Sequence, residues 1–198
     1  MKLVAVLDRE ENSKEIDKNY LNAISNNGAI PILINENNLN LLNICGGVLL
    51  TGGDNKGSLD DYLIKYVIDN KLPLLGICQG MQSMALYNTN EVLVDVDNHY
   101  DCNHLVNIND SKLKNIICKS KILVNSYHHQ QVLNSKEFKI VAKSNDGVVE
   151  AVESSSNIFQ IGVEWHPERM MVDDSKRMMV DDSKRLFSEF INQIKDTL

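Results

Sequence analysis

The stretch from Lys71 to Leu86 places the tightest constraint on how this chain can fold. Its first half is a short apolar run led by Pro73, which is typical of a buried strand bounded by a turn. Its second half, from Gln79, is composed of Met, Gln, Ala and Leu residues that favour a helix. The stretch therefore predicts a strand that turns sharply into a helix, with Cys78 at the junction.

Cys78 is flanked two residues away on each side by a glycine, Gly76 and Gly80. G-x-C-x-G at a strand-to-helix junction is the sulfur version of the nucleophile elbow, a turn that holds a nucleophile above the sheet. Side chains at the two glycine positions would collide with the neighbouring helix or strand. We expect the N–H groups and positive dipole end of the helix to favour the thiolate. The competing interpretation is a small buried cysteine in a helix-packing turn.

Length, charge and cysteine spacing narrow the class of protein. With 198 residues, we expect one domain over residues 1–198 with a substantial core. The net charge of -7 and the pI near 5.2 argue against nucleic-acid and membrane partners. The four cysteines lack paired metal-ligand spacing, which indicates reduced thiols rather than a metal site or a disulfide framework. The apolar run at the N-terminus is too short for a secretory signal or a membrane span, so we expect a cytoplasmic location.

Strand and helix patterns alternate through the first half of the chain. Strands are predicted at 3–7, 30–34, 47–50 and just before Cys78, and helices at about 13–26 and 58–70 with Ser58 as N-cap. This alternation predicts an α/β fold, a three-layer sandwich with a mostly parallel central sheet. Further strands are predicted at 92–96, 122–124, 138–142, 147–152 and 159–163, followed by an amphipathic helix over about 181–196. The C-terminal half is therefore expected to be rich in strands.

An octapeptide occurs twice in tandem, at 169–176 and again at 177–184, with identical letters. Two copies of eight residues are too few and too short for a repeat architecture. We expect the extra copy to form a surface loop or an added helical segment, without a chemical role.

The second candidate site segment is Gly162-Val-Glu-Trp-His-Pro-Glu168. In an extended chain, residues two apart point to the same face, so His166 and Glu168 can act together. Pro167 favours an extended conformation at His166. Glu168 can thus orient an imidazole that faces Cys78, which gives a nucleophile, a base and an orienting group.

With these segments in view, the chain resembles a class I glutamine amidotransferase domain with a flavodoxin-like fold. It is most similar to the stand-alone hydrolase branch, the gamma-glutamyl-gamma-aminobutyrate hydrolase-like family (peptidase C26). The matching segments are 27–31, 47–54, 75–82, 124–130, 142–151 and 162–169.

This resemblance implies amide hydrolysis through a gamma-glutamyl thioester. Cys78 would attack the side-chain carbonyl of a gamma-glutamyl amide, and His166 would take the thiol proton and deliver it to the leaving amine. Glu168 would fix the tautomer of His166. The family takes its oxyanion donors from the backbone N–H groups at the positions of Gly53 and Gln79.

The resemblance also implies the substrate-binding positions, which are Gly52, Gln82, Tyr127, His128 and His129. The adjacent histidines His128 and His129 could suggest a metal, but the sequence offers no third ligand at a suitable spacing. We therefore expect no metal and no cofactor. The expected partner is a small gamma-glutamyl substrate, and a homodimer is left open.

Three functions remain to be distinguished. The leading hypothesis is a free-standing hydrolase of gamma-glutamyl amides. The alternative is the glutaminase subunit of a two-chain amidotransferase, which would supply ammonia to a synthase partner. It is favoured by the short chain, whereas the segments 165–169 and 125–130 favour the hydrolase. The hydrolase branch usually carries a longer insertion that shapes the amine pocket, and this chain has only Asp54–Gly57 there, which leaves the leaving amine open. The remote alternative is an inactive-scaffold binding protein, which would be expected to lack the Cys, His or Glu.

Overall fold

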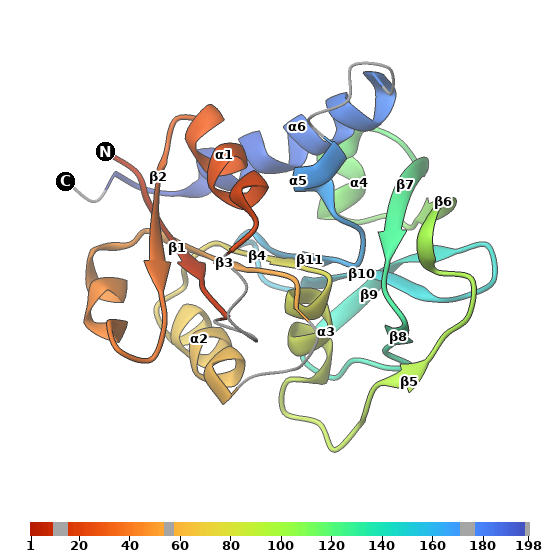
Figure 1. The fold of residues 1–198 in the computed structure, drawn as a ribbon, viewed down its shortest axis with the longest axis horizontal. Coiled ribbons are helices and arrows are strands. Elements are labelled where there is room, and N and C mark those ends of the chain that lie inside the picture. The colour runs from red at the N-terminus through yellow and green to blue at the C-terminus, as the bar shows by residue number, and fades with distance from the viewer. Residues whose placement is uncertain (10–15, 54–57, 171–176, 197–198) are drawn as a thin grey trace.

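The computed structural model describes residues 1–9, 16–53, 58–170 and 177–196. Its centre is a nine-stranded sheet with the order β2-β1-β3-β4-β11-β10-β9-β6-β7 (Figure 1). The first five strands in this order run parallel to one another. They are β2 (Ile30–Ile34), β1 (Leu3–Leu7), β3 (Gly47–Leu50), β4 (Leu74–Ile77) and β11 (Gln160–Val163). Every residue of β1, β3, β4 and β11 is buried, which is why these strands are continuous apolar runs.

The other half of the sheet is antiparallel and comes mostly from the C-terminal half of the chain. Its strands are β10 (Val149–Ser154), β9 (Phe138–Ser144), β6 (Tyr100–Ile108) and β7 (Lys121–Tyr127). A separate two-stranded ladder pairs β5 (Val94–Asp95) with β8 (Gln130–Gln131). This arrangement confirms the predicted strand-rich C-terminal half.

Helices cover both faces of the sheet and complete the three layers (Figure 1). One face packs against α1 (Lys18–Asn26), α4 (Lys112–Ile117), α5 (Pro167–Met170) and α6 (Arg177–Gln193). The opposite face packs against the 3₁₀ helix η2 (Leu39–Ile44), α2 (Ser58–Asp69) and α3 (Gln79–Leu86). The predicted α/β three-layer fold is confirmed. Over the described ranges, we find no helix with the length and apolar character that a membrane span requires.

Several predicted boundaries differ from the structure. The β6 strand and the α4 helix were not predicted, and the strand predicted at 92–96 shortens to the two residues of β5. Helix α1 begins at Lys18, where the Asp17 side chain accepts a hydrogen bond from the Asn19 N–H and caps the helix. The earlier residues 13–15 and the side chain of the predicted cap Ser58 lie outside the described part of the chain.

The second copy of the octapeptide forms the first two turns of α6, so the closing helix begins at Arg177 rather than near 181. Met179 and Val180 of this copy are buried. Asp182 is also buried, and both of its carboxylate oxygens accept hydrogen bonds from Lys119 Nζ, at 2.6 and 2.8 Å. The copy is therefore an added helical segment, one of the two predicted outcomes. Residues 171–176 of the first copy lie outside the described residues.

Candidate active site

Cys78 lies at the sharp turn between β4 and α3. Its backbone adopts φ 52° and ψ -111°, a conformation that non-glycine residues rarely adopt and that marks a strained elbow. A Cβ at Gly76 would lie 2.7 Å from Met84 Sδ, and a Cβ at Gly80 would overlap the Leu50 carbonyl oxygen. The expected requirement for both glycines is confirmed.

The Cys78 thiol is in a protonated state at neutral pH. Its side chain is buried, and this burial raises the pKa of the thiol well above its ordinary value, although the backbone N–H of Gln79 acts in the opposite direction. The expectation that the helix N-terminus favours a thiolate was therefore wrong, because desolvation outweighs the helix end. Any reaction at this sulfur needs a base to remove the proton.

His166 and Glu168 form a buried pair where β11 ends and α5 begins. The distance between His166 Nδ1 and Glu168 Oε1 is 2.7 Å, and Glu168 is almost completely buried. Since a carboxylate can only accept, His166 Nδ1 carries the hydrogen and donates it, which leaves the lone pair of the ring on Nε2. The two side chains meet as the sequence predicted, but the predicted extended chain was wrong, because Glu168 lies in the helix α5.

Asn125 fixes the backbone of His166. Its Oδ1 accepts a hydrogen bond of 2.8 Å from the His166 N–H, and its Nδ2 donates one of 3.0 Å to the His166 carbonyl oxygen. Both hydrogen bonds are buried. The sequence analysis placed Asn125 only within a matching segment, and the role of its side chain follows from the contact between β7 and the segment after β11.

Gly52 is the point at which the elbow and the imidazole meet. A Cβ at this position would lie 3.0 Å from His166 Cε1, 3.5 Å from Cys78 Cβ and 2.9 Å from the Tyr20 hydroxyl oxygen. Cys78 and His166 therefore border the same small volume, which only a glycine leaves free. The Gly52 N–H donates a 2.9 Å hydrogen bond to the Tyr20 hydroxyl. The next residue, Gly53, is exposed.

The loop that carries Gly52 is held at its start. Arg9 Nε donates to the Thr51 carbonyl oxygen at 3.1 Å, and its two terminal nitrogens donate to the buried Asp60 carboxylate at 2.6 and 2.8 Å. The Thr51 hydroxyl donates to the Leu7 carbonyl oxygen at 2.9 Å. Such bidentate pairing fixes both partners, so the glycine loop leaves β3 in a defined direction.

The predicted substrate-binding residues divide into two groups. Tyr127 packs edge-on against His166, with 5.9 Å between the ring centroids. The Gln82 side-chain amide donates to Glu164 Oε1 at 2.6 Å and to the Gln130 carbonyl oxygen at 3.2 Å. His128 is buried between His99 and the Gln82 contacts, because its Nδ1 lies 2.9 Å from the same Gln130 carbonyl oxygen and 3.4 Å from the same Glu164 Oε1. His129, in contrast, is exposed and stacks on Tyr100 at 4.2 Å between ring centroids.

Glu164 is a buried carboxyl that the sequence analysis did not identify as a candidate. Burial raises its pKa well above the ordinary value, and the negative charge of Glu150 acts in the same direction. Its Oε1 accepts the hydrogen bond from Gln82, and His128 Nδ1 lies 3.4 Å from the same oxygen.

A pocket of about 220 Å³ adjoins the imidazole side of the site. Its lining includes Asn125, which holds the His166 backbone, and Tyr127, which packs against the His166 ring. Arg169 also lines this pocket, and its guanidinium lies 5.2 Å from the centroid of the Tyr127 ring.

Comparison with known proteins gives a consistent result. The sequence matches the Peptidase C26 family over residues 56–168. It is 25% identical over 228 aligned residues to a glutamine amidotransferase-like protein of Rickettsia prowazekii, covering 76% of this chain and 81% of that protein. It is 26% identical over 201 residues to the gamma-glutamyl-gamma-aminobutyrate hydrolase of Escherichia coli K12, covering 79% of each.

A solved structure extends the likeness to the whole fold. The glutaminase domain of Trypanosoma brucei CTPS, with bound acivicin, superimposes with a TM-score of 0.79 at 16% identity. The superposition covers 98% of this chain and 93% of that one. The fold is that of class I glutamine amidotransferases.

Proposed function

The chain belongs to the Peptidase C26 family, and on this premise we propose that it hydrolyses gamma-glutamyl amides through a thioester at Cys78. The observation that carries the proposal is the convergence at Gly52, where Cys78 at its strained elbow and His166 with its Glu168 partner border one volume. These residue types are a nucleophile, a base and an orienting group, and the first two lie beside the same glycine position. All three residues lie within the family match.

In the first step, the Cys78 sulfur attacks the carbonyl carbon of the gamma-glutamyl amide. His166 Nε2 takes the thiol proton as the carbon–sulfur bond forms. This base is needed because burial raises the pKa of the Cys78 thiol. The resulting imidazolium is stabilised by Glu168, 2.7 Å from Nδ1. The carbonyl oxygen becomes an oxyanion, and the backbone N–H groups of Gly53 and Gln79 are the proposed donors to it.

In the second step, the carbon–nitrogen bond breaks and the amine leaves with the proton from His166. A water molecule then attacks the thioester, His166 accepts its proton, and the Cys78 thiol and glutamate are released. The pocket beside Tyr127 and Arg169 supports departure of the amine on the imidazole side. Gln82 and Tyr127 are proposed to contact the glutamyl part of the substrate.

The experiment that tests this proposal is glutamate release by the purified chain. L-glutamine is supplied in one reaction, and a panel of gamma-glutamyl amines, including gamma-glutamyl-gamma-aminobutyrate, in the others. We expect turnover of the gamma-glutamyl amines, with glutamine a poor substrate. Cys78→Ala should abolish turnover, whereas the matched control Cys118→Ala, at an exposed cysteine, should retain it. Turnover by Cys78→Ala would contradict the proposal.

A second candidate function is a glutaminase subunit that passes ammonia to a synthase. Two observations support it, the likeness to the glutaminase domain of CTPS and the four residues 54–57 that alone separate the glycine loop from α2. It predicts slow turnover of every substrate by the isolated chain, together with an intact Cys78 that still reacts with an alkylating agent. The same panel therefore distinguishes the two functions.

A further inference from the structure

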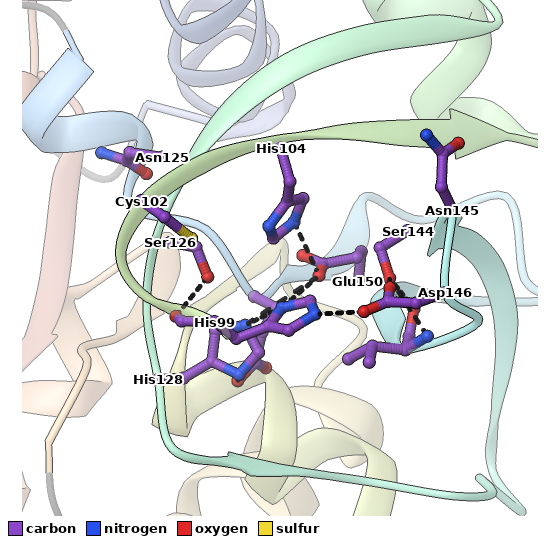
Figure 2. Close-up of polar contacts among 12 residues, drawn as sticks. His99, Cys102, His104, Asn125, Ser126, His128, Ser144, Asn145, Asp146 and Glu150 are labelled. Atoms are coloured by element: carbon purple, nitrogen blue, oxygen red, sulfur yellow. Dashed lines mark hydrogen bonds and ion pairs between the residues drawn. The ribbon is translucent and has the colours of Figure 1, made fainter. Parts of the chain in front are cut away.

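A histidine–glutamate cluster, made up of His99, His104, His128 and Glu150, lies apart from the proposed reaction (Figure 2). His99 precedes β6 and His104 lies within it, His128 follows β7, and Glu150 belongs to β10. His99, His128 and Glu150 are each at most 4% exposed. The cluster therefore joins three separate segments in the interior, and it has no part in the chemistry of Cys78.

Three atoms of the cluster form a small triangle. The distance from His99 Nδ1 to His128 Nε2 is 3.2 Å, from His99 Nδ1 to Glu150 Oε1 it is 3.5 Å, and from His128 Nε2 to Glu150 Oε1 it is 3.9 Å. A point equidistant from all three atoms lies about 2.1 Å from each, which matches Zn–N and Zn–O bond lengths of about 2.0–2.2 Å.

The outer nitrogens of the two histidines fix which ring nitrogens carry hydrogen. His128 Nδ1 lies 2.9 Å from the Gln130 carbonyl oxygen, which can only accept, so Nδ1 donates. His99 Nε2 lies 3.0 Å from a carboxylate oxygen of Asp146, which accepts, so Nε2 also donates. In their neutral forms the two rings consequently turn lone pairs toward each other, and these need an electropositive centre between them.

The carboxylate of Glu150 also needs an electropositive group beside it. Glu150 is fully buried, and the imidazoles of His99 and His104 lie against it. His104 Nε2 lies 2.9 Å from Glu150 Oε1. Within the described part of the chain, however, neither buried oxygen of Glu150 has a hydrogen bond of standard geometry. A buried carboxylate without such partners is costly unless a cation lies beside it.

We propose that this cluster is a structural metal site, in which His99 Nδ1, His128 Nε2 and a Glu150 oxygen bind a divalent transition metal of the zinc type. Two imidazoles and a carboxylate are a donor set that suits Zn²⁺, and a His whose second nitrogen donates to a carbonyl or carboxylate is the usual support of such a ligand. The sequence analysis expected no metal because it found no third ligand. Glu150 supplies that ligand from β10.

The surrounding backbone holds the ligands in place before a metal binds. The His128 N–H and the Ser126 hydroxyl both donate to the His99 carbonyl oxygen, at 3.1 and 2.5 Å. A metal here would tie β6, the β7–β8 link and β10 together. Tyr127, the last residue of β7, directly precedes His128, so the metal would steady one wall of the proposed active site without touching Cys78.

The proposal is tested on the full chain after treatment with a chelator, by titration with Co²⁺ as a spectroscopic probe and with Zn²⁺ in competition. Wild type should bind one Co²⁺ with visible ligand-field bands and without a thiolate-to-cobalt charge-transfer band, because no cysteine is a ligand. Cys78→Ser should give the same spectrum, which excludes metal held by the active-site thiol. Added Zn²⁺ should displace the Co²⁺ and raise the thermal midpoint of wild type.

Variants locate the site. Glu150→Gln and His99→Gln should each weaken binding by at least about tenfold, whereas His129→Asn, an exposed neighbour of His128, should bind like wild type. Circular dichroism checks that each variant is folded. If a variant is not folded, the wild-type titration alone tests whether the chain binds the metal. Absence of binding by wild type would overturn the proposal and leave a proton between His99 and Glu150. A thiolate band, or unchanged affinity in folded Glu150→Gln, would overturn it as well. Because no substrate is used, these outcomes are independent of the proposed hydrolase activity.

Discussion

Replacement of Asn125 by leucine tests how the position of His166 is maintained. The Asn125 side chain is buried and makes two buried hydrogen bonds, one to the N–H and one to the carbonyl oxygen of His166. Leucine has a similar size and keeps water out of the position, but it can neither donate nor accept. Asn125→Leu therefore leaves the His166 N–H buried without a partner, whereas the His166 carbonyl oxygen keeps the 3.2 Å hydrogen bond from the Arg169 N–H.

The expected loss follows from the unpartnered N–H. A buried donor left without a partner costs about 1–3 kcal/mol, so the free energy of unfolding should fall by about 1–3 kcal/mol, with a central value of about 2 kcal/mol. For a chain of this size, each kcal/mol lowers the thermal midpoint by about 2–4 °C, so the central value gives a decrease of about 4–8 °C. Since His166 loses both of its contacts with Asn125, kcat should also fall by about 10–100-fold.

The assay is thermal unfolding followed by circular dichroism, with glutamate release measured at a temperature at which the variant is folded. The matched control is Asn107→Leu, because Asn107 is exposed on β6 and its side-chain amide donates an exposed hydrogen bond to Asn145 Oδ1. The control should change the free energy of unfolding by no more than about 0.5 kcal/mol. Equal midpoints and equal kcat for the two variants would refute the role assigned to Asn125.

Two further predictions concern the elbow. At neutral pH, iodoacetamide should label Cys78 more slowly than the exposed Cys118, because burial raises the pKa of the Cys78 thiol and so lowers its thiolate fraction at every pH below that pKa. Peptide mapping measures both rates, and a labelling rate for Cys78 that stops rising below about pH 8 would contradict the raised pKa. Gly80→Ala should lower the free energy of unfolding by about 1–3 kcal/mol, because its Cβ would overlap the Leu50 carbonyl oxygen. Chemical denaturation measures this loss, and an unchanged stability would show that α3 can move away from β3.

The parallel strands could be predicted from the sequence because their residues are apolar along the whole strand. The bounds predicted at 3–7, 30–34 and 47–50 agree with β1, β2 and β3 residue by residue, although only Ile34 of β2 is buried. The strand β6 was missed because polar residues interrupt its apolar ones, and only Val106 and Ile108 among its nine residues are buried. Its pairing with β7 and β9, rather than its own composition, makes it a strand.

The residues of the candidate site also divide into those that the sequence could predict and those that it could not. Cys78 lies in a local turn signature, and His166 and Glu168 are two residues apart, so short-range patterns were sufficient to propose them. The contact of Asn125 with His166 and the cluster of His99 with Glu150 join segments about forty to fifty residues apart, and sequence spacing carries no information about such contacts. The protonation of Cys78 was also beyond the sequence, because it depends on how much solvent the fold excludes.

The central claim is that Cys78 carries the glutamyl group during the reaction. The most direct test is to mix the chain with a gamma-glutamyl amine, quench with acid within the first turnovers, and map the peptides by mass spectrometry. We predict one glutamyl adduct on the Cys78 peptide in wild type, none in Cys78→Ala, and a greatly slowed appearance of the adduct in His166→Asn. Steady hydrolysis with no adduct on Cys78, or with the same turnover in Cys78→Ala, would contradict the mechanism.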